Sequence, residues 1–158
     1  MPTEITPTDF TWTPHIFSAL MIILGWSVIY RNAKKISSRN ETFTIINRVA
    51  DHLRSIEEKT VEFYSHGHEK QHPALWYSDI ALHIESIREH ITLLKSRKID
   101  PGLNHLANLR EHTSLRCEEA GTMDQESKIL MFQDLKAASS RLLDTLHKKF
   151  EQRHPFLN

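Results

Sequence analysis

The residues best suited to chemistry are histidines, of which the 158-residue chain has 11. Three fall within one short stretch, His66-Gly-His68-Glu-Lys-Gln-His72. Neutral imidazole is a common ligand for zinc, copper and nickel, and an open metal site needs three protein ligands. A single His-x-His-x3-His pattern is a weak signal, so we prefer a polar loop with solvent-facing histidines. A divalent-metal site at His66, His68 and His72 remains the alternative.

The sequence also contains two Glu-x-x-His words, Glu69–His72 and Glu151–His154. Paired words of this type build di-iron sites inside four-helix bundles. Here each word is followed at once by a proline, Pro73 or Pro155, which pushes the residue before it out of the α region. Both words are therefore expected at helix ends, where their side chains do not face a bundle interior.

Other catalytic signatures are absent from the sequence. Its 4 glycines are scattered, so none forms a phosphate-binding loop, and no Gly-x-Ser-x-Gly elbow occurs. Cys117 is the single cysteine, and His112 lies five residues before it, a spacing that does not share one helix face. We expect Cys117 to be a structural thiol in a reducing compartment, no bound cofactor, and a chain that is not an enzyme.

The distribution of charged residues along the chain indicates which structural elements hold these side chains. With 20 Lys+Arg against 20 Asp+Glu the chain has no basic excess, which argues against nucleic-acid binding. The charges are unevenly placed, because no Lys or Arg precedes Arg31 and residues 10–30 carry no formal charge. As a helix, this stretch reaches about 31 Å, close to the hydrocarbon thickness of a bilayer. The sequence therefore predicts a transmembrane helix over residues 10–30.

Aromatic residues near both ends of this stretch fit interfacial anchors, namely Trp12, Trp26 and Tyr30. A cleaved signal peptide fits poorly, because the residues before the stretch are acidic rather than basic. A buried core helix also fits poorly, because such helices rarely run so far without a charge. The single N-terminal transmembrane helix is the preferred interpretation.

A basic flank follows the apolar stretch and consists of Arg31, Lys34, Lys35 and Arg39. By the positive-inside rule this flank stays in the cytoplasm. It also attracts anionic lipid by about 1 kcal/mol per residue near the surface. The expected organisation is a short extracytoplasmic tail (1–9), a transmembrane helix (10–30), a basic juxtamembrane segment (31–40) and a cytoplasmic helical domain (41–158). The expected location is a membrane, in bacteria the inner membrane.

Glycines separate the periodic segments of the remaining chain and predict helices over 36–65, 73–98, 101–119 and 123–153. No proline or glycine separates the first of these from the basic flank, so it is expected to continue the transmembrane helix. Thr122 to Gln125 resemble a capping box at the start of the last helix. No segment shows the alternation of a strand, so the sequence predicts an all-α, antiparallel bundle of about four helices.

The second predicted helix carries the clearest seam, whose members alternate by three and four as in a coiled coil: Tyr77, Ile80, Ile84, Ile87, Ile91 and Leu94. The eight residues from His83 to His90 match those from His105 to His112 at four positions. We interpret the match as two segments that present the same apolar stripe, with a functional duplication as the alternative.

Three functions are compatible with this organisation. The first is a membrane-anchored helical protein that acts by docking a cytoplasmic protein or by self-association. The second is a membrane-acting effector, toxin-like or part of antiviral defence, whose cytoplasmic domain controls oligomerisation of the transmembrane helix. The third is a metal-binding membrane sensor that uses the histidine loop.

Overall fold

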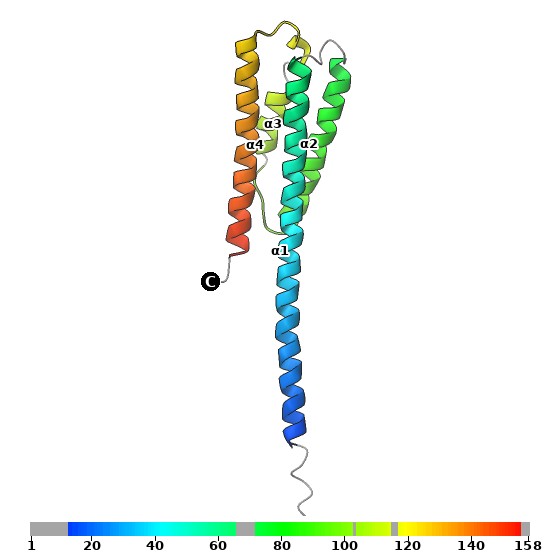
Figure 1. Cartoon of the computed structure of the whole chain (residues 1–158), viewed down its shortest axis with the longest axis vertical. Helices are drawn as coiled ribbons and strands as arrows, with labels where there is room; N and C mark the ends of the chain where they lie inside the picture. The colour runs from blue at the N-terminus through cyan, green and yellow to red at the C-terminus, as the bar shows by residue number, and fades with distance from the viewer. Residues whose placement is uncertain (1–12, 66–71, 103, 115–116, 156–158) are drawn as a thin grey trace, which may run out of the picture. The chain divides into compact units, whose positions relative to one another are not determined.

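The computed structural model describes residues 13–65, 72–102, 104–114 and 117–155. Within these ranges the regular structure is helical and contains no strand, which confirms the all-α prediction. The α-helices are α1 (Thr13–Ser65), α2 (Pro73–Ser96), α3 (Asn104–Ser114) and α4 (Gln125–Arg153), and a short 3-10 helix, η2 (Cys117–Glu119), precedes α4 (Figure 1).

The chain divides into two compact units, Met1–Asn40 and Glu41–Asn158. Helix α1 is a single element that contributes to both units. The unit that begins at Glu41 is a helical bundle with its own core.

In the bundle, residues 41–65 of α1 run antiparallel to α2 and α4. Contacts near the start of this stretch join it to the ends of the partner helices, as in Arg97 with Glu41 and Phe43 with Phe150. Contacts near its end join it to their beginnings, as in Phe63 with Trp76. The sequential helices α1 and α2 are therefore antiparallel neighbours.

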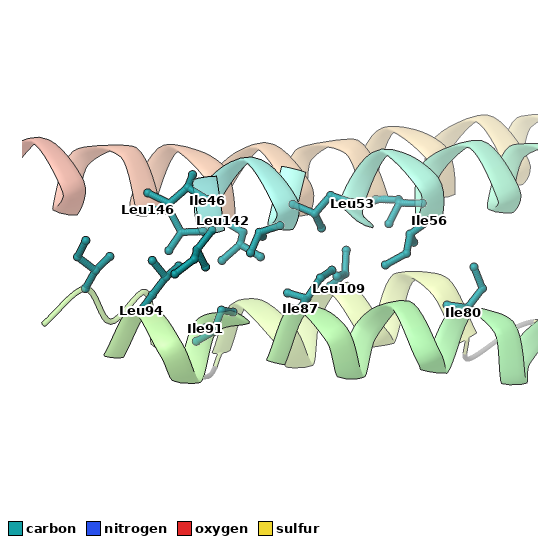
Figure 2. Close-up of a cluster of buried hydrophobic side chains, with 14 of the residues drawn as sticks. Ile46, Leu53, Ile56, Ile80, Ile87, Ile91, Leu94, Leu109, Leu142 and Leu146 are labelled. Atoms are coloured by element: carbon teal, nitrogen blue, oxygen red, sulfur yellow. The ribbon is translucent and has the colours of Figure 1, made fainter. Parts of the chain in front are cut away.

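The core is built from aliphatic and aromatic side chains of all four α-helices. Figure 2 shows Ile46, Leu53 and Ile56 of α1 facing the side chains from α2. The labelled residues from the other helices are Ile80, Ile87, Ile91, Leu94, Leu109, Leu142 and Leu146, all at most 2% exposed. Their three- and four-residue spacing places them on one stripe of each helix, which buries the apolar surface that stabilises the bundle.

Helix α2 begins and ends with recognisable caps. Pro73 occupies the first turn, where its missing N–H has no intrahelical partner to lose, and the His72 side chain accepts a hydrogen bond from the Ala74 N–H at 3.2 Å. At the other end the Ile99 N–H donates to the Leu94 carbonyl and the Lys98 N–H to the Lys95 carbonyl. These are the two hydrogen bonds of a Schellman motif.

The third helix is shorter than the predicted range 101–119. Gly102 has a φ of +90°, and its N–H donates to the Asp100 carboxylate at 2.9 Å, so the chain turns here instead of starting a helix at Pro101. Helix α3 is described from Asn104 to Ser114, and η2 is a separate 3-10 turn. The predicted start at Pro101 was wrong, because the Asp100 side chain and the positive φ of Gly102 form a turn where a first-turn proline was expected.

The predicted capping box at the start of α4 was also placed wrongly. Asp124 is the N-cap, and its carboxylate accepts a hydrogen bond from the Ser127 N–H at 2.9 Å. Thr122 instead donates its hydroxyl to the Glu119 carbonyl at 3.1 Å. The cap therefore lies two residues later than the sequence pattern indicated.

Candidate functional site

The apolar stretch of α1 presents large side chains on all its sides. Each large apolar residue from Ile16 to Tyr30 is between 53% and 69% exposed. A helix that is apolar all round is normally buried in a protein or in lipid. Among the described residues, α1 is the one helix whose length and composition suit a membrane span.

The residues predicted to anchor this stretch are exposed where the structure describes them. Trp26 is 69% and Tyr30 68% exposed, whereas Trp12 lies outside the described residues. In the basic flank, Arg31, Lys34 and Lys35 are exposed and Arg39 is half-buried.

The predicted histidine loop falls largely in residues 66–71, outside the described part of the chain, so His66 and His68 have no structural account. His72 lies at the start of α2, where its Nδ1 accepts the capping hydrogen bond. Among the described residues, no group of three histidine, cysteine or carboxylate side chains has the arrangement of a metal site.

The α2 seam lies inside the bundle. Ile80, Ile87, Ile91 and Leu94 are buried, and Tyr77 and Ile84 pack against the core at its edge. The matching segment in α3 also directs its apolar residues to the core, because Leu109 is buried and Leu106 packs against the same cluster. The repeated words thus place their apolar residues in one core.

A groove of about 480 Å³ opens between α1 and α4. Its apolar lining comes from Val61, Phe132 and Leu135. Its charged lining consists of Glu57, Glu58 and Glu62 from α1 and Lys136 from α4. Val61 is 44% exposed, so its side chain is accessible from solvent. The groove therefore combines accessible apolar surface with a net excess of carboxylates.

Two further apolar residues on α4 are exposed. Ile129 is 47% and Leu130 55% exposed. Ile129 precedes Phe132 by three residues and so lies on the same side of the helix. These residues were not singled out from the sequence, because an exposed apolar residue on an amphipathic helix looks like a core residue until its neighbours are placed.

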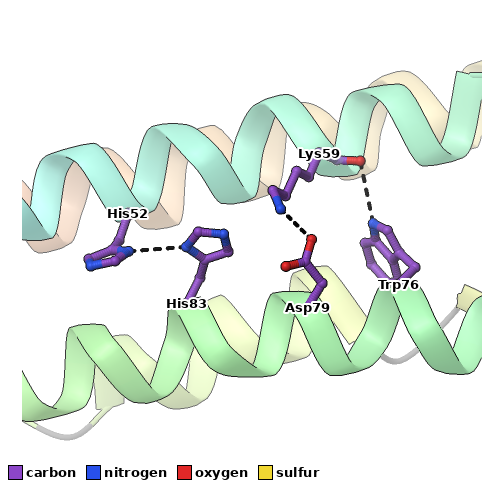
Figure 3. Close-up of polar contacts among 5 residues, drawn as sticks. All are labelled: His52, Lys59, Trp76, Asp79 and His83. Carbon is purple, nitrogen blue, oxygen red and sulfur yellow. Dashed lines mark hydrogen bonds and ion pairs between the residues drawn. The ribbon is translucent and has the colours of Figure 1, made fainter.

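Polar contacts join α1 to α2 beside the core (Figure 3). The Lys59 ammonium pairs with the Asp79 carboxylate, and the Trp76 indole N–H donates to the Lys59 carbonyl at 3.4 Å. The Nδ1 atoms of His52 and His83 lie 3.0 Å apart. In Figure 3 both rings point into the space between the two helices.

A third histidine lies against this pair. The rings of His52 and His90 meet edge to face, with centroids 5.6 Å apart. Burial lowers the pKa of His83 below its ordinary value; Lys59 lowers it further and Asp79 opposes the shift. Burial likewise lowers the pKa of His90, assisted by His52 and Arg48.

The sequence pattern does not by itself indicate this cluster. His83 and His90 are seven residues apart and so lie on one face of α2. That spacing was a usable signal, but it was interpreted only as part of the repeat. Nothing in the sequence alone placed His52 opposite them, because the contact depends on the register between α1 and α2.

Cys117 lies in η2, half-buried against the core. The structural role expected for Cys117 stays a prediction.

Comparisons of the chain with protein-family models, with curated proteins and with solved structures find no match.

Proposed function

We propose that the chain is a single-pass membrane protein whose helical bundle binds another protein. The observation that carries the proposal is the contrast within α1. Large apolar side chains from Ile16 to Tyr30 are exposed, whereas residues 41–65 bury a complete apolar stripe in the bundle. Exposed apolar surface of that extent is stable when lipid covers it.

The proposed topology places residues 1–9 outside the cytoplasm, 10–30 in the bilayer, the flank 31–40 at the inner surface and 41–158 in the cytoplasm. Its support is the basic flank, in which Arg31, Lys34 and Lys35 are exposed and within reach of anionic headgroups. In a bacterium the corresponding location is the inner membrane.

The groove between α1 and α4 is the docking surface that we propose for the partner. Its apolar lining suits apolar anchors of a partner helix, and its three glutamates favour Lys or Arg beside those anchors. The partner is therefore an amphipathic helix with a basic edge, and no reaction is assigned to the chain.

Reporter fusions test the topology. Alkaline phosphatase fused after Asn158 is expected to be inactive and a fluorescent protein at the same position to be bright. Active phosphatase with a dark fluorescent fusion would contradict the orientation.

Site-specific photo-crosslinking in intact membranes tests the docking surface. A photoreactive residue at Val61, inside the groove, is expected to give a discrete adduct, and one at Leu82, 69% exposed on α2, is the matched control. Replacing Glu57 and Glu62 by Lys should remove the Val61 adduct. An adduct of twice the chain's own mass identifies a second copy as the partner, and equal labelling from both positions would contradict the groove.

Membrane potential during overexpression separates docking from the effector alternative. A docking protein is expected to leave the potential unchanged. Loss of potential that depends on residues 10–30 would instead favour an effector that acts on the membrane.

A further inference from the structure

Three histidines meet between α1 and α2 outside the proposed docking groove. His52 contacts both partners, with ring centroids 5.3 Å from His83 and 5.6 Å from His90. All three side chains are half-buried. The cluster lies beside the core residues Leu53 and Ile87, which belong to the two helices it joins.

The short contact in this cluster limits how many protons it can hold. Two Nδ1 atoms 3.0 Å apart form a hydrogen bond when one carries a proton and the other offers a lone pair. If both rings become imidazolium ions, two N–H donors face each other and two positive charges lie side by side. The His52–His83 contact is therefore compatible with at most one protonated Nδ1.

His90 adds a second site where protonation is costly. Its Nδ1 is buried without a well-directed hydrogen bond, and the Ser86 carbonyl one turn earlier favours its protonation only weakly. A charge on this ring would lie against His52 at the edge-to-face contact.

The charged groups around the rings come from the same two helices. On α1, Lys59 disfavours a charge on His83 and Arg48 disfavours one on His90. On α2, Asp79 and Glu89 favour those charges, but Asp79 is already paired with Lys59. Burial is the largest influence on both rings and lowers the pKa of each.

We propose that His52, His83 and His90 form a proton-sensitive contact that holds α2 against α1 when the rings are neutral and weakens when they become charged. The ligand of this site is the proton, and the trigger is acidification of the compartment that the bundle faces. The proposal goes beyond the docking function and does not depend on it.

The direction of the effect follows from the lowered pKa values. His83 and His90 take up protons near pH 6.5 in the unfolded chain and at lower pH in the folded chain, so the unfolded state binds more protons in between. Folding is therefore unaffected above about pH 7 and weakens as the pH falls through that window. Each of the two lowered histidines contributes up to about a tenfold loss of the folding equilibrium constant per pH unit.

Unfolding of the full chain in detergent micelles, followed by circular dichroism between pH 7.5 and 5, tests the proposal. The unchanged chain should lose stability over this range. The double variant His83→Gln/His90→Gln should have a flatter profile, because glutamine does not titrate. The matched control His147→Gln, at an exposed position on α4, should follow the unchanged chain. A double-variant profile parallel to that of the unchanged chain would overturn the proposal.

A second measurement covers the case in which the double variant does not fold. In the unchanged chain, the ring proton resonances of His83 and His90 should titrate at lower pH than those of a free histidine peptide. Titration at or above the peptide's midpoint would overturn the proposal. Zn²⁺ provides a further check on the EDTA-treated chain. If Zn²⁺ raises the melting temperature of the unchanged chain but not that of the double variant, the cluster is a metal site and the proposal is overturned.

Discussion

At the scale of single residues, Trp76 makes close aromatic contacts in the bundle. Its ring stacks on Phe63 with centroids 4.5 Å apart and meets Tyr64 edge to face. It is 2% exposed, and its indole N–H reaches the Lys59 carbonyl. Both the packing and the hydrogen bond therefore tie the start of α2 to the end of α1.

Replacing Trp76 by Ala should lower the free energy of unfolding by about 3–5 kcal/mol, because it leaves a large cavity among aromatic rings. Chemical denaturation of the full chain in micelles measures the loss. The neighbouring change Leu75→Ala is the control, since Leu75 is 65% exposed, and should alter stability by less than about 0.5 kcal/mol. Similar losses for the two variants would show that Trp76 is not a core residue.

The cap of α4 gives a prediction about pH. Hydrogen bonds from the Ser127 side chain and backbone N–H lower the pKa of Asp124. Its contribution to folding is therefore present above the unfolded pKa, about 3.9, and is lost as the pH falls through the lower folded value. Asp124→Ala, which removes the cap, should melt at a lower temperature than the unchanged chain at pH 6.

Asp124→Asn keeps a capping oxygen without a charge that titrates, so it separates the cap from the charge. The difference in melting temperature between the unchanged chain and this variant should shrink as the pH falls below 4. An undiminished difference at pH 2.5 would mean that the Asp124 charge does not contribute through this cap.

Single residues also show which contacts could be predicted from the sequence and which could not. The apolar stripe of α1, such as Val49, Leu53 and Ile56, follows from its spacing alone and is buried. The contact of His52 with His83 does not follow, because a shift of one residue between the two helices would separate the rings. Pairings across helices depend on three-dimensional register, which local periodicity does not specify.

At the scale of elements, helix ends were predictable where one residue type decides them. Pro73 sets the start of α2 because only the first turn tolerates its missing N–H. The start of α3 was not predictable from Pro101, because the Asp100 side chain and the positive φ of Gly102 make a turn there instead. Whether Pro101 begins a helix therefore depends on the backbone conformation of the residues before and after it, which the local sequence does not specify.

The end of α2 gives a prediction at this scale. Lys98 has a φ of +68° in the Schellman motif, a conformation that costs a residue with a Cβ about 1–2 kcal/mol. Its side chain is exposed. Lys98→Gly should therefore raise the free energy of unfolding by about 1 kcal/mol, measured by chemical denaturation.

Gly102→Ala is the matched opposite change, because Gly102 has a φ of +90° and open space around an added Cβ. It should destabilise the bundle through backbone strain alone. Destabilisation by Lys98→Gly would show that the lysine side chain contributes more than the left-handed backbone costs.

At the scale of the whole chain, the uneven charge pattern was the most informative sequence feature. The average composition describes an ordinary globular protein, with 39% hydrophobic and 25% charged residues. The structure divides the chain at Asn40, just after the last residue of the basic flank, Arg39. The large apolar residues from Ile16 to Tyr30 in the first unit are exposed, whereas the second unit has a buried apolar core, a distinction that average composition cannot show.

This difference between the units leads to a prediction about where the chain resides. Replacing Ile23 and Leu24 by Arg puts two charges near the middle of the apolar stretch, each costing about 2.5–3.5 kcal/mol on insertion. The variant should move from the membrane fraction to the soluble fraction on centrifugation. The bundle should unfold as in the unchanged chain, because both positions lie in the first unit and are exposed.

The control for this prediction carries the same new charges in the bundle. Leu75 and Leu82 are exposed on α2 and are as apolar as Ile23 and Leu24, with exposed fractions of 65% and 69%. Replacing both by Arg should leave the chain in the membrane fraction, because the proposed topology places only residues 10–30 in lipid. If the two pairs shift the chain equally, the membrane association depends on total apolar surface rather than on residues 10–30, and the single-span proposal is wrong.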